Sequence, residues 1–521
     1  MNEFQRKVLL YLNIKESDIP ELTKKVTFDD LESPYVFLDM QKARDRILKA
    51  VNNNEKIMIY GDYDCDGISA TSIMVKMFQI LNRKVGYYIP SRYIDGYGIN
   101  VNRAKQIIAK GYSLVITVDN GVAQDEALTL LKENNIDVIL TDHHAVIKDL
   151  PPYYAFVHPE YKTSVNELKQ CGAYVAFMLS IAVLNYVDPY LLTLASAATI
   201  SDMMPIKSYN RDLVKLSLDI INKDKTSPYH SLYNMDKVID EDAFGFSICP
   251  KINAIGRIRE DMSVNDLVRF FVTDDENIKR DILRMIDDVN NERKNILAEA
   301  INAIDFTKYE NDKVIVERFD NISEGVIGLI AARLMNECLK PAIVLTKIHN
   351  QDVLKGSARS MEGLNIEDAF GELSSYLLAY GGHAGAGGLS LSIDNYEAFK
   401  VAVNHYAKDK NIIPPEEKYI EVYPNELTYD NYLFVKSLSP YGMEFPAPKF
   451  KLKIDVSSVL YMGNEKQHFR GQLNPKCSFV AFNLSEKLKN KKSVYVVGNL
   501  EYDDFKKGYN IKFKINDVLD N

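Results

Sequence analysis

Three aspartates stand at alternate positions in GDYDCDG, the segment at residues 61–67. The segment follows an apolar run and precedes a helical pattern, so Asp62, Asp64 and Asp66 can converge on one point. An aspartate in such a place can simply cap the helix. One cap needs one aspartate, however, and three within five residues repel one another unless a cation lies between them. The spacing therefore favours a cation site, in which Gly67 is expected to permit a tight turn.

The same arrangement of polar groups recurs later in the chain. TVDNG carries Asp119, TDHH carries Asp142, His143 and His144, and ATISDMMP carries Asp202. A lone aspartate at a strand end or a lone histidine is more often structural, so the evidence is the repetition. Carboxylates with imidazoles suit Mn²⁺ or Mg²⁺, and the imidazoles favour Mn²⁺. A set of this size can hold two ions about 3.5–4 Å apart, as in phosphoryl transfer.

Alternating strands and helices are expected to position these groups. Apolar runs predict strands at residues 57–60, 113–118, 138–140 and 154–158. Helical patterns at 69–81 and 125–135 lie between them. This alternation predicts an α/β fold with a parallel sheet covered by helices on both faces. Ligands collect at the carboxyl ends of the strands in such sheets, which is where Asp62, Asp119 and Asp142 stand.

The remaining chain predicts three further parts. Residues 160–270 look mainly helical, and residues 275–303 predict a long helix that joins two domains. A second α/β unit is expected at about 312–408, and short alternating strands after Pro414 and Pro415 suggest a small antiparallel β-barrel. The expected domains are a catalytic domain, a linking helix, a second α/β domain and a β-rich tail, at residues 1–270, 271–311, 312–412 and 413–521.

The second α/β unit holds groups suited to a phosphate. GSARS at 356–360 and GGHAGAGG at 381–388 are glycine-rich, and a glycine-rich segment that opens a helix offers backbone amides to an anion. A single such segment is more often only a tight turn. Ser357, Arg359 and His383 add donors, and the guanidinium can bind two phosphate oxygens at once.

Composition limits the class of protein. The 521 residues are 46% hydrophobic and 26% charged, with no apolar run of the roughly 18–20 residues that span a bilayer. The first residues lack the pattern of a signal peptide, and five scattered cysteines without a CxxC pair favour a reducing, cytoplasmic setting.

The net charge of −9 argues mildly against a polyanionic substrate, although bound cations reverse the local sign. The tail is locally basic and carries aromatic residues among its lysines. These residues are Lys487, Lys489, Lys491, Lys492, Lys506, Lys507, Lys512, Lys514, Phe505, Tyr509 and Phe513.

Taken together, the motifs resemble the bacterial RecJ single-strand exonucleases of the DHH superfamily. The resemblance extends over most of the chain, and the ordered set is far more specific than DHH alone. Besides the segments above it includes YIPSRYIDGYG at 88–98, HPE at 158–160, KINAIGR at 251–257 and GVIGLIAARL at 325–334.

The resemblance implies a 5′-to-3′ exonuclease of single-stranded DNA that acts in repair and recombination with two Mn²⁺ or Mg²⁺ ions. It implies that Asp64, Asp66, Asp119, His143 and Asp202 are metal ligands. Asp62 and Asp142 would be supporting carboxylates, and His144 would meet the scissile phosphate. It further implies that Arg92 and Arg257 contact the DNA backbone, that Ser357 and Arg359 hold the 5′ phosphate, and that His383 belongs to the GGH motif.

The resemblance also implies an OB-fold tail that binds single strands, a monomer, and a single-strand-binding protein and a helicase as partners. This chain departs from the usual family pattern at three places. Ser323 and Glu324 stand where Trp-His is usual, and the chain contains no tryptophan. SARS replaces SGRS, and the turn before the OB-fold, which normally contains Asn, reads SPYGMEFPAP. These departures concern substrate affinity more than metal chemistry.

Two alternatives remain. One is a DHH phosphodiesterase of short RNA or cyclic dinucleotides, whose members typically lack the long helix and the OB-like tail. The other is a non-catalytic scaffold, which the complete set of candidate ligands disfavours.

Overall fold

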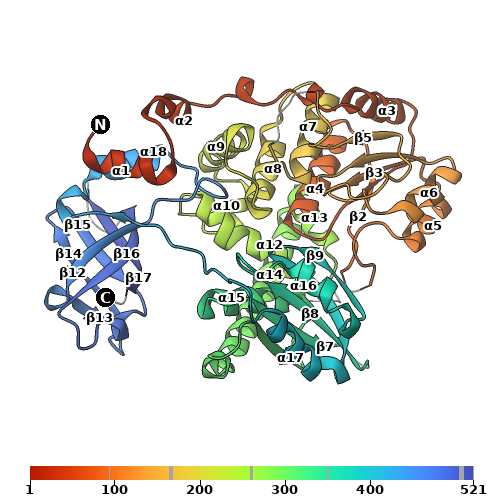
Figure 1. The fold of residues 1–521 in the computed structure, drawn as a ribbon. Helices are drawn as coiled ribbons and strands as arrows, with labels where there is room; N and C mark the ends of the chain where they lie inside the picture. Colours follow the sequence, from red (N-terminus) through yellow and green to blue (C-terminus); the bar gives the residue numbers. More distant parts are fainter. Residues whose placement is uncertain (93, 164–167, 259–261, 349–350, 504–509, 520–521) are drawn as a thin grey trace. The chain divides into compact units, whose positions relative to one another are not determined.

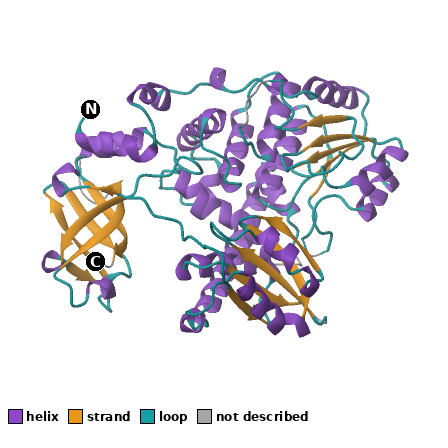
Figure 2. Cartoon of the chain, viewed as in Figure 1, coloured by secondary structure: helices purple, strands orange, loops and turns teal. Residues whose placement is uncertain are grey.

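The computed structural model describes residues 1–92, 94–163, 168–258, 262–348, 351–503 and 510–519. The chain divides into two compact units. One contains Glu32–Met204 and Ser217–Pro415, and the other contains Met1–Leu31, Pro205–Leu216 and Glu416–Asn521. Figure 1 traces the chain through its helices and strands, and Figure 2 shows that the strands gather in three sheets.

The first sheet confirms the predicted parallel α/β fold. Its five strands are all parallel, in the order β2-β1-β3-β4-β5. They are β1 (Ile57–Tyr60), β2 (Gly86–Tyr88), β3 (Leu114–Val118), β4 (Asp137–Thr141) and β5 (Ala155–Val157). The sequence analysis expected β1, β3, β4 and β5 but not β2, which has only three residues, none of them fully buried.

Helices cover both faces of this sheet. Apolar side chains of α5 (Val101–Ala109) and α6 (Asp125–Glu133) share one core with Met58, Val115 and Val138 of the strands. The other face is covered by α3 (Met40–Asn52), α4 (Cys65–Ile80) and α7 (Gly172–Leu184) (Figure 1). Helices α4 and α7 are apolar on all sides, as is typical of helices buried within a domain.

Further helices follow, as expected for residues 160–270. They are α8 (Pro189–Ser201), α9 (Ser208–Lys223), α10 (Pro228–Leu232), α11 (Glu241–Ala243), α12 (Cys249–Ile258) and α13 (Asn265–Val272). A π-helical turn at Phe244–Ile248 leads into α12. The predicted long helix is α14, Glu276–Asn302, which starts at the capping side chain of Asp275 and packs against α12 and α15.

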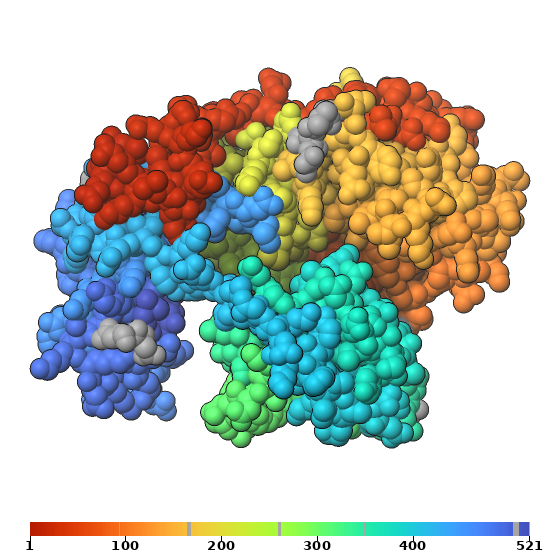
Figure 3. Space-filling model, in the orientation of Figure 1, coloured from red at the N-terminus to blue at the C-terminus, as the bar shows by residue number. Residues whose placement is uncertain are grey.

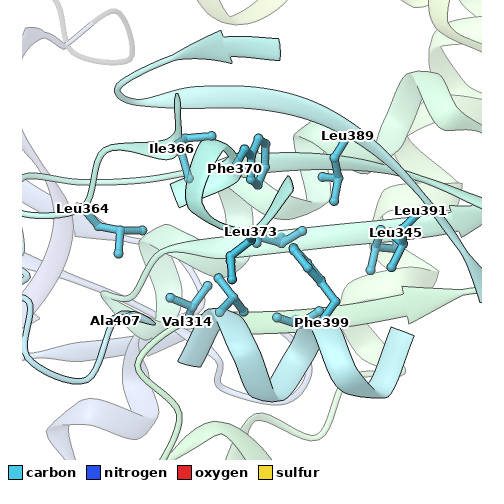
Figure 4. Packing of buried hydrophobic residues seen from close by; sticks show 14 of the residues in the cluster. Val314, Leu345, Leu364, Ile366, Phe370, Leu373, Leu389, Leu391, Phe399 and Ala407 are labelled. Atoms are coloured by element: carbon cyan, nitrogen blue, oxygen red, sulfur yellow. The ribbon is translucent and has the colours of Figure 1, made fainter. Parts of the chain in front are cut away.

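The second α/β domain is built on a mixed sheet in the order β6-β7-β8-β10-β9. The strands are β6 (Ile315–Phe319), β7 (Ala342–Lys347), β8 (Val353–Arg359), β9 (Ala379–His383) and β10 (Ala386–Ser392). One face packs on α15 (Glu324–Cys338), and the other packs on α16 (Ile366–Glu372) and α17 (Tyr396–Tyr406). Figure 4 shows Phe370, Leu373 and Phe399 meeting Leu345 and Leu391 in this second core.

The tail forms a mostly antiparallel sheet in the order β11-β12-β16-β17-β15-β14-β13. Its strands are β11 (Ile420–Glu421), β12 (Phe450–Asp455), β13 (Leu460–Met462), β14 (His468–Asn474), β15 (Cys477–Ala481), β16 (Ser493–Tyr502) and β17 (Ile511–Leu519). Helix α18, Tyr429–Ser437, precedes β12. This confirms the expected β-rich tail.

The first residues pack on this tail, whereas the expected boundaries grouped them with the catalytic domain. Helix α1 (Glu3–Leu12) buries Phe4, which stacks on Phe450 of β12 at 5.2 Å between ring centroids. Lys7 donates to Glu426 at 2.9 Å, and Asn2 donates to Asn431 at 2.9 Å. In the space-filling view, the first residues (red) lie directly on the tail (blue) (Figure 3).

The buried Arg211 holds the same unit together. Its guanidinium donates to the carbonyl oxygens of Leu438 and Pro440, each at 2.6 Å, and lies over the Phe445 ring at 4.8 Å. Nearby, Lys215 donates to the carbonyls of Leu22 and Lys24, both at 2.9 Å. The unit is thus assembled from three separate stretches of chain.

Within the described residues, no helix combines the length and apolarity needed to cross a membrane.

Candidate active site

Strand β1 and helix α4 position the first three aspartates. Asp64 caps α4, since its carboxylate accepts hydrogen bonds from the backbone N–H groups of Asp66 and Gly67 at 3.0 and 3.1 Å. Gly67 does not form a turn, contrary to the sequence interpretation, because it lies within the first turn of α4. It is needed for close packing: a Cβ there would lie 2.4 Å from the carbonyl oxygen of Asp62.

The other candidate ligands lie at the ends of neighbouring elements. Asp119 follows β3 with a φ of +60°, a conformation that aspartate and asparagine adopt more readily than most residues. Asp142, His143 and His144 follow β4, and Asp202 forms the C-cap of α8. Three short strands and two helices therefore bring the acidic and imidazole groups to one edge of the sheet.

These side chains form three interlocking groups, each with ligand atoms within 4.8 Å of one another. They are Asp62, Asp64 and Asp119; Asp119, His143 and His144; and Asp66, His143 and Asp202. His143 Nε2 lies 3.2 Å from Asp119, 3.5 Å from Asp66 and 3.6 Å from Asp202. The structure thus brings together all five predicted ligands, and it also places Asp62 and His144 at ligand distance.

The electrostatics of the cluster fit bound cations. Burial, together with the neighbouring carboxylates, raises the pKa of Asp62 and Asp119 well above the ordinary range and that of Asp202 to about 8. Burial lowers the pKa of His143, which favours the neutral form that binds metals. Among the described residues, none donates a hydrogen bond to the buried Oδ1 of Asp62. A divalent cation would satisfy that oxygen and offset the repulsion among the carboxylates.

Asp142 belongs to none of the three groups and acts on His144 instead. It is fully buried and accepts from the backbone N–H groups of Val122, His143 and His144 at 2.8–3.1 Å. Its Oδ1 also lies 2.8 Å from His144 Nδ1. Burial opposes charge on both groups, but these hydrogen bonds lower the pKa of Asp142 and raise that of His144 to about 9. The Asp142 carboxylate therefore favours the protonated form of the His144 imidazole.

Two contributors to this site were not predicted from the sequence. The backbone N–H groups of Gly172 and Ala173, at the start of α7, donate to the two carboxylate oxygens of Asp66 at 2.7 and 2.6 Å. Tyr97 places its Oη 3.1 Å from His144 Nδ1. For Gly172 and Ala173, the only signal in the sequence was the small-residue segment CGA at the start of an apolar helix. Tyr97 belongs to the motif YIPSRYIDGYG, but the sequence analysis gave it no role.

A pocket of about 560 Å³ lies between the two α/β domains of the same unit. Its lining includes Arg92, Arg257, Ser357 and Arg359, four of the five predicted phosphate-binding residues. Burial and the nearby Arg92 lower the pKa of Arg257, because a buried guanidinium is poorly solvated and a neighbouring positive charge repels it. Among the described residues, the buried Nε of Arg92 has no hydrogen-bond partner. An anion would satisfy these groups.

The pocket is joined to the metal cluster through Tyr63, which stands between Asp62 and Asp64. The Arg92 guanidinium lies over the Tyr63 ring at 4.5 Å. A Cβ at Gly256, one residue before Arg257, would lie 2.8 Å from the Tyr63 carbonyl oxygen. The arginine-lined pocket and the carboxylates are thus parts of one packed structure.

The expected mode of phosphate binding in the second domain was wrong in one respect. GSARS lies largely in β8, and GGHAGAGG forms the hairpin of β9 and β10, so neither opens a helix. The donors are side chains of β8, where Arg359 Nη1 donates to Ser357 Oγ at 3.0 Å. Gly328 of α15 leaves room for them, since a Cβ there would lie 3.1 Å from both. His383 is exposed at the end of β9 and is not part of the pocket lining.

Part of the basic run of the tail is paired with acidic side chains. Lys487 pairs with Asp517 at 2.6 Å, and Lys512 and Lys514 pair with Glu501 at 3.3 and 3.1 Å. Phe513 is buried in the core of the sheet and is not available for stacking. Lys506, Lys507, Phe505 and Tyr509 lie outside the described residues.

Comparison with known proteins places each part of the chain. Residues 56–199 match the DHH family, N-terminal domain, residues 311–409 match the DHHA1 domain, and residues 420–517 match the RecJ OB domain. The single-stranded-DNA-specific exonuclease RecJ of Bacillus subtilis is 31% identical over 91% of this chain. The chain spans 63% of that relative's length.

Solved structures agree in fold. RecJ of Thermus thermophilus in complex with Mn²⁺ matches 99% of this chain and 76% of its own with a TM-score of 0.84, at 24% identity. An exonuclease RecJ bound to manganese matches 73% of this chain and 96% of its own with a TM-score of 0.63, at 28% identity.

Proposed function

Because the chain belongs to the RecJ family of the DHH superfamily, we propose that it is a metal-dependent exonuclease of single-stranded DNA. It hydrolyses phosphodiester bonds from the 5′ end and acts in DNA repair and recombination. The observation that carries the proposal is the set of three interlocking ligand groups at the edge of the first sheet. The proposal also includes a monomeric, cytoplasmic enzyme that works with a single-strand-binding protein and a helicase.

The ligand roles follow from the cluster. Asp64, Asp66, Asp119, His143 and Asp202 would hold two Mn²⁺ or Mg²⁺ ions, and Asp119 is shared between two of the groups. When bound, such a pair lowers the pKa of a water molecule and stabilises the charge on the entering and leaving oxygens. Asp62 completes the site with its buried oxygen.

The side chains of the protein supply the remaining steps. His144, which Asp142 holds and whose protonated form Asp142 favours, donates a hydrogen bond to a nonbridging oxygen of the scissile phosphate. The Tyr97 hydroxyl, 3.1 Å from the same Nδ1 atom that contacts Asp142, helps to orient the His144 ring. Asp142 acts as a positioning residue, because it hydrogen-bonds to His144 but is not itself a member of any of the three ligand groups.

A nuclease assay tests the proposal directly. A single strand labelled at either end is incubated with Mn²⁺, with Mg²⁺ and with EDTA. Labelled mononucleotides should appear at once from a 5′ label and only late from a 3′ label, and EDTA should stop the reaction. Cleavage of dinucleotides or cyclic dinucleotides without cleavage of long strands would favour the short-substrate phosphodiesterase instead.

Direction of digestion is expected to depend on Arg359. The metal ligands alone do not distinguish the two ends of a strand, so a second anchor must recognise a terminus. A terminal phosphate carries more charge than an internal one, and the Arg359 guanidinium can bind two of its oxygens. Arg359→Ala should lower kcat/KM for 5′-phosphorylated strands by about 10- to 100-fold, and by less for 5′-hydroxyl strands.

Two further variants sharpen this prediction. Arg359→Lys should restore only part of the loss, because an ammonium group lacks the planar fork. Arg333→Ala, which removes an exposed guanidinium from the outer part of α15, is the matched control and should leave the rates unchanged. Digestion from the 3′ end by the unaltered protein, or equal losses on both 5′ ends in Arg359→Ala, would contradict this account of direction.

The tail is proposed to bind the single strand beyond the active site. Tyr461 of β13 and Phe482 after β15 are 46% and 54% exposed, and Phe482 contacts His468 of β14 at 5.3 Å between ring centroids. Exposed aromatic rings on such a fold can stack on bases, at about 1–3 kcal/mol per base. They replace the buried Phe513 as candidates for stacking.

The double variant Tyr461→Ala/Phe482→Ala should weaken binding of a 40-nucleotide strand by about fivefold or more while hardly changing cleavage of a five-nucleotide strand. Removal of residues from 416 onward is a poorer test, because it would strip the surface on which α1 buries Phe4. Tyr186→Ala, at an exposed aromatic residue of the other unit, is the control. Equal losses on long and short strands would argue against a binding role for these two rings.

A further inference from the structure

One acidic side chain lies in the pocket that otherwise gathers cations. Arg92, Arg257, Lys355 and Arg359 line the pocket together with Glu324, whose carboxylate lies 2.8 Å from Lys355 Nζ. The Glu324 side chain is 19% exposed and that of Lys355 is 45% exposed, so the carboxylate is the more buried partner. The pocket therefore holds four positive groups and one negative group.

Glu324 does more than begin a helix. An acidic residue in the first turn stabilises a helix through its dipole, and Glu324 is the first residue of α15. That end is already capped by Ser323, whose Oγ accepts from Gly325 N–H. The carboxylate of Glu324 instead reaches across to Lys355 on β8.

Lys355 lies on the face of β8 that lines the pocket, so its contact with Glu324 affects the charge of the pocket. Successive side chains of a strand alternate between its faces, so Lys355, Ser357 and Arg359 share one face of β8, the face that lines the pocket. Glu324 thus neutralises the first cation in a row that ends at the proposed anchor for the terminal phosphate.

We propose that the Glu324–Lys355 pair makes the pocket accept both 5′-phosphorylated and 5′-hydroxyl ends. Glu324 is the residue that sets the ratio of the affinities for these two ends. This rests on the proposed function, in which the pocket holds the 5′ terminus. A terminal phosphate carries roughly −1.5 to −2 charges. A terminal phosphate is more negative than an internal phosphodiester, and the Glu324 carboxylate repels this additional charge. The same carboxylate can accept a hydrogen bond from a terminal hydroxyl.

The test compares two probes on each protein: five-nucleotide oligothymidylates, labelled at the 3′ end with a fluorophore, carrying either a 5′ phosphate or a 5′ hydroxyl. Binding is measured by fluorescence anisotropy without divalent metal, and cleavage is measured with Mn²⁺. Glu324→Gln should raise the affinity ratio of phosphate over hydroxyl by roughly five- to tenfold, since it removes one nearby negative charge. Glu337→Gln, which removes the same charge from the far end of α15, should leave the ratio unchanged.

A second variant separates this role from a purely structural one. Lys355→Gln should lower the ratio only slightly, because Glu324 already offsets that cation. In the Glu324→Gln background, the same Lys355→Gln change should lower the affinity ratio several-fold more. A double-mutant cycle measures this coupling between the two residues. Each ratio compares two ends on one preparation, so a loss of folded protein cancels from it.

The outcomes separate this inference from the proposed function. An unchanged ratio in Glu324→Gln, or additive effects in the cycle, overturns the inference while nuclease activity still supports the proposed function. A shifted binding ratio in a protein without nuclease activity supports the inference and overturns the proposed function. If no variant distinguishes the two ends in binding, the pocket does not hold the terminus, and the inference fails together with the account of direction.

Discussion

Replacement of Asp119 by asparagine should lower nuclease activity by about a thousandfold or more, because Asp119 contributes to two of the three ligand groups. Asparagine is the suitable replacement: it keeps the shape of the side chain and tolerates the φ of +60°, where alanine would add backbone strain. The folded structure should therefore persist, and the loss can be assigned to the charge.

The same variant should be more stable than the unaltered protein when metal is absent. Burial and then the neighbouring carboxylates raise the pKa of Asp62 and Asp119, so ionised carboxylates destabilise the metal-free cluster, and removal of one of them relieves both costs. Thermal unfolding in EDTA should give a higher Tm for Asp119→Asn, whereas the increase in Tm caused by Mn²⁺ should largely disappear.

Asp149→Asn, at an exposed acid of the same domain, is the control and should change neither activity nor the response to Mn²⁺. A full Mn²⁺-dependent increase in Tm in Asp119→Asn would contradict the assignment of this residue as a ligand. An absent response in the unaltered protein would instead favour a scaffold without a metal site.

Gly172→Ala should disable the site almost as completely, although residue 172 carries no functional group. A Cβ there would lie 2.6 Å from Asp119 Cβ and 2.8 Å from Asp119 Cα, so α7 or Asp119 must move. Either movement also lengthens the hydrogen bonds from Gly172 and Ala173 to Asp66. Activity should fall by about a hundredfold or more, since catalytic groups tolerate displacements of only about 1 Å.

Gly371→Ala provides the matched control for this substitution. Gly371 lies in helix α16, and a Cβ there would meet nothing within 4 Å, so alanine should be neutral or slightly stabilising. Activity and the Mn²⁺-dependent Tm shift are measured on both variants. Near-normal activity in Gly172→Ala would show that the start of α7 does not hold Asp66 and Asp119 in place.

Local patterns predicted that these side chains would cluster, because most of them stand at the end of a short buried strand or at the end of a helix. Asp62, Asp119 and Asp142 could be assigned to one edge of a parallel sheet from strand order alone. Asp202 and the two histidines came from the recurrence of the same residue types. The packing that holds these groups in place was not visible, because the contact from Gly172 to Asp66 spans 106 residues.

The glycine-rich segments were misread for a physical reason. Glycine permits a tight turn, an anion-binding loop or close packing between strands, and composition does not distinguish these uses. Here β8, β9 and β10 pair side by side, and the glycines bring neighbouring elements close together. The ion pairs of Glu501 and Asp517 with lysines of the tail could not be predicted either, because the fold brings together residues that are distant in the sequence.

The packing of α1 on the tail has a consequence for synthesis of the chain. Phe4 and Phe450 stack although 446 residues separate them. At about 5–20 residues per second, translation keeps Phe4, Val8, Leu9 and Leu12 without their final partner for roughly 20–90 s. During that time the apolar face of α1 is open to chaperones and to other nascent chains. Ribosomes that stall before β12 is complete should therefore yield aggregation-prone chains even when the parallel sheet has already folded.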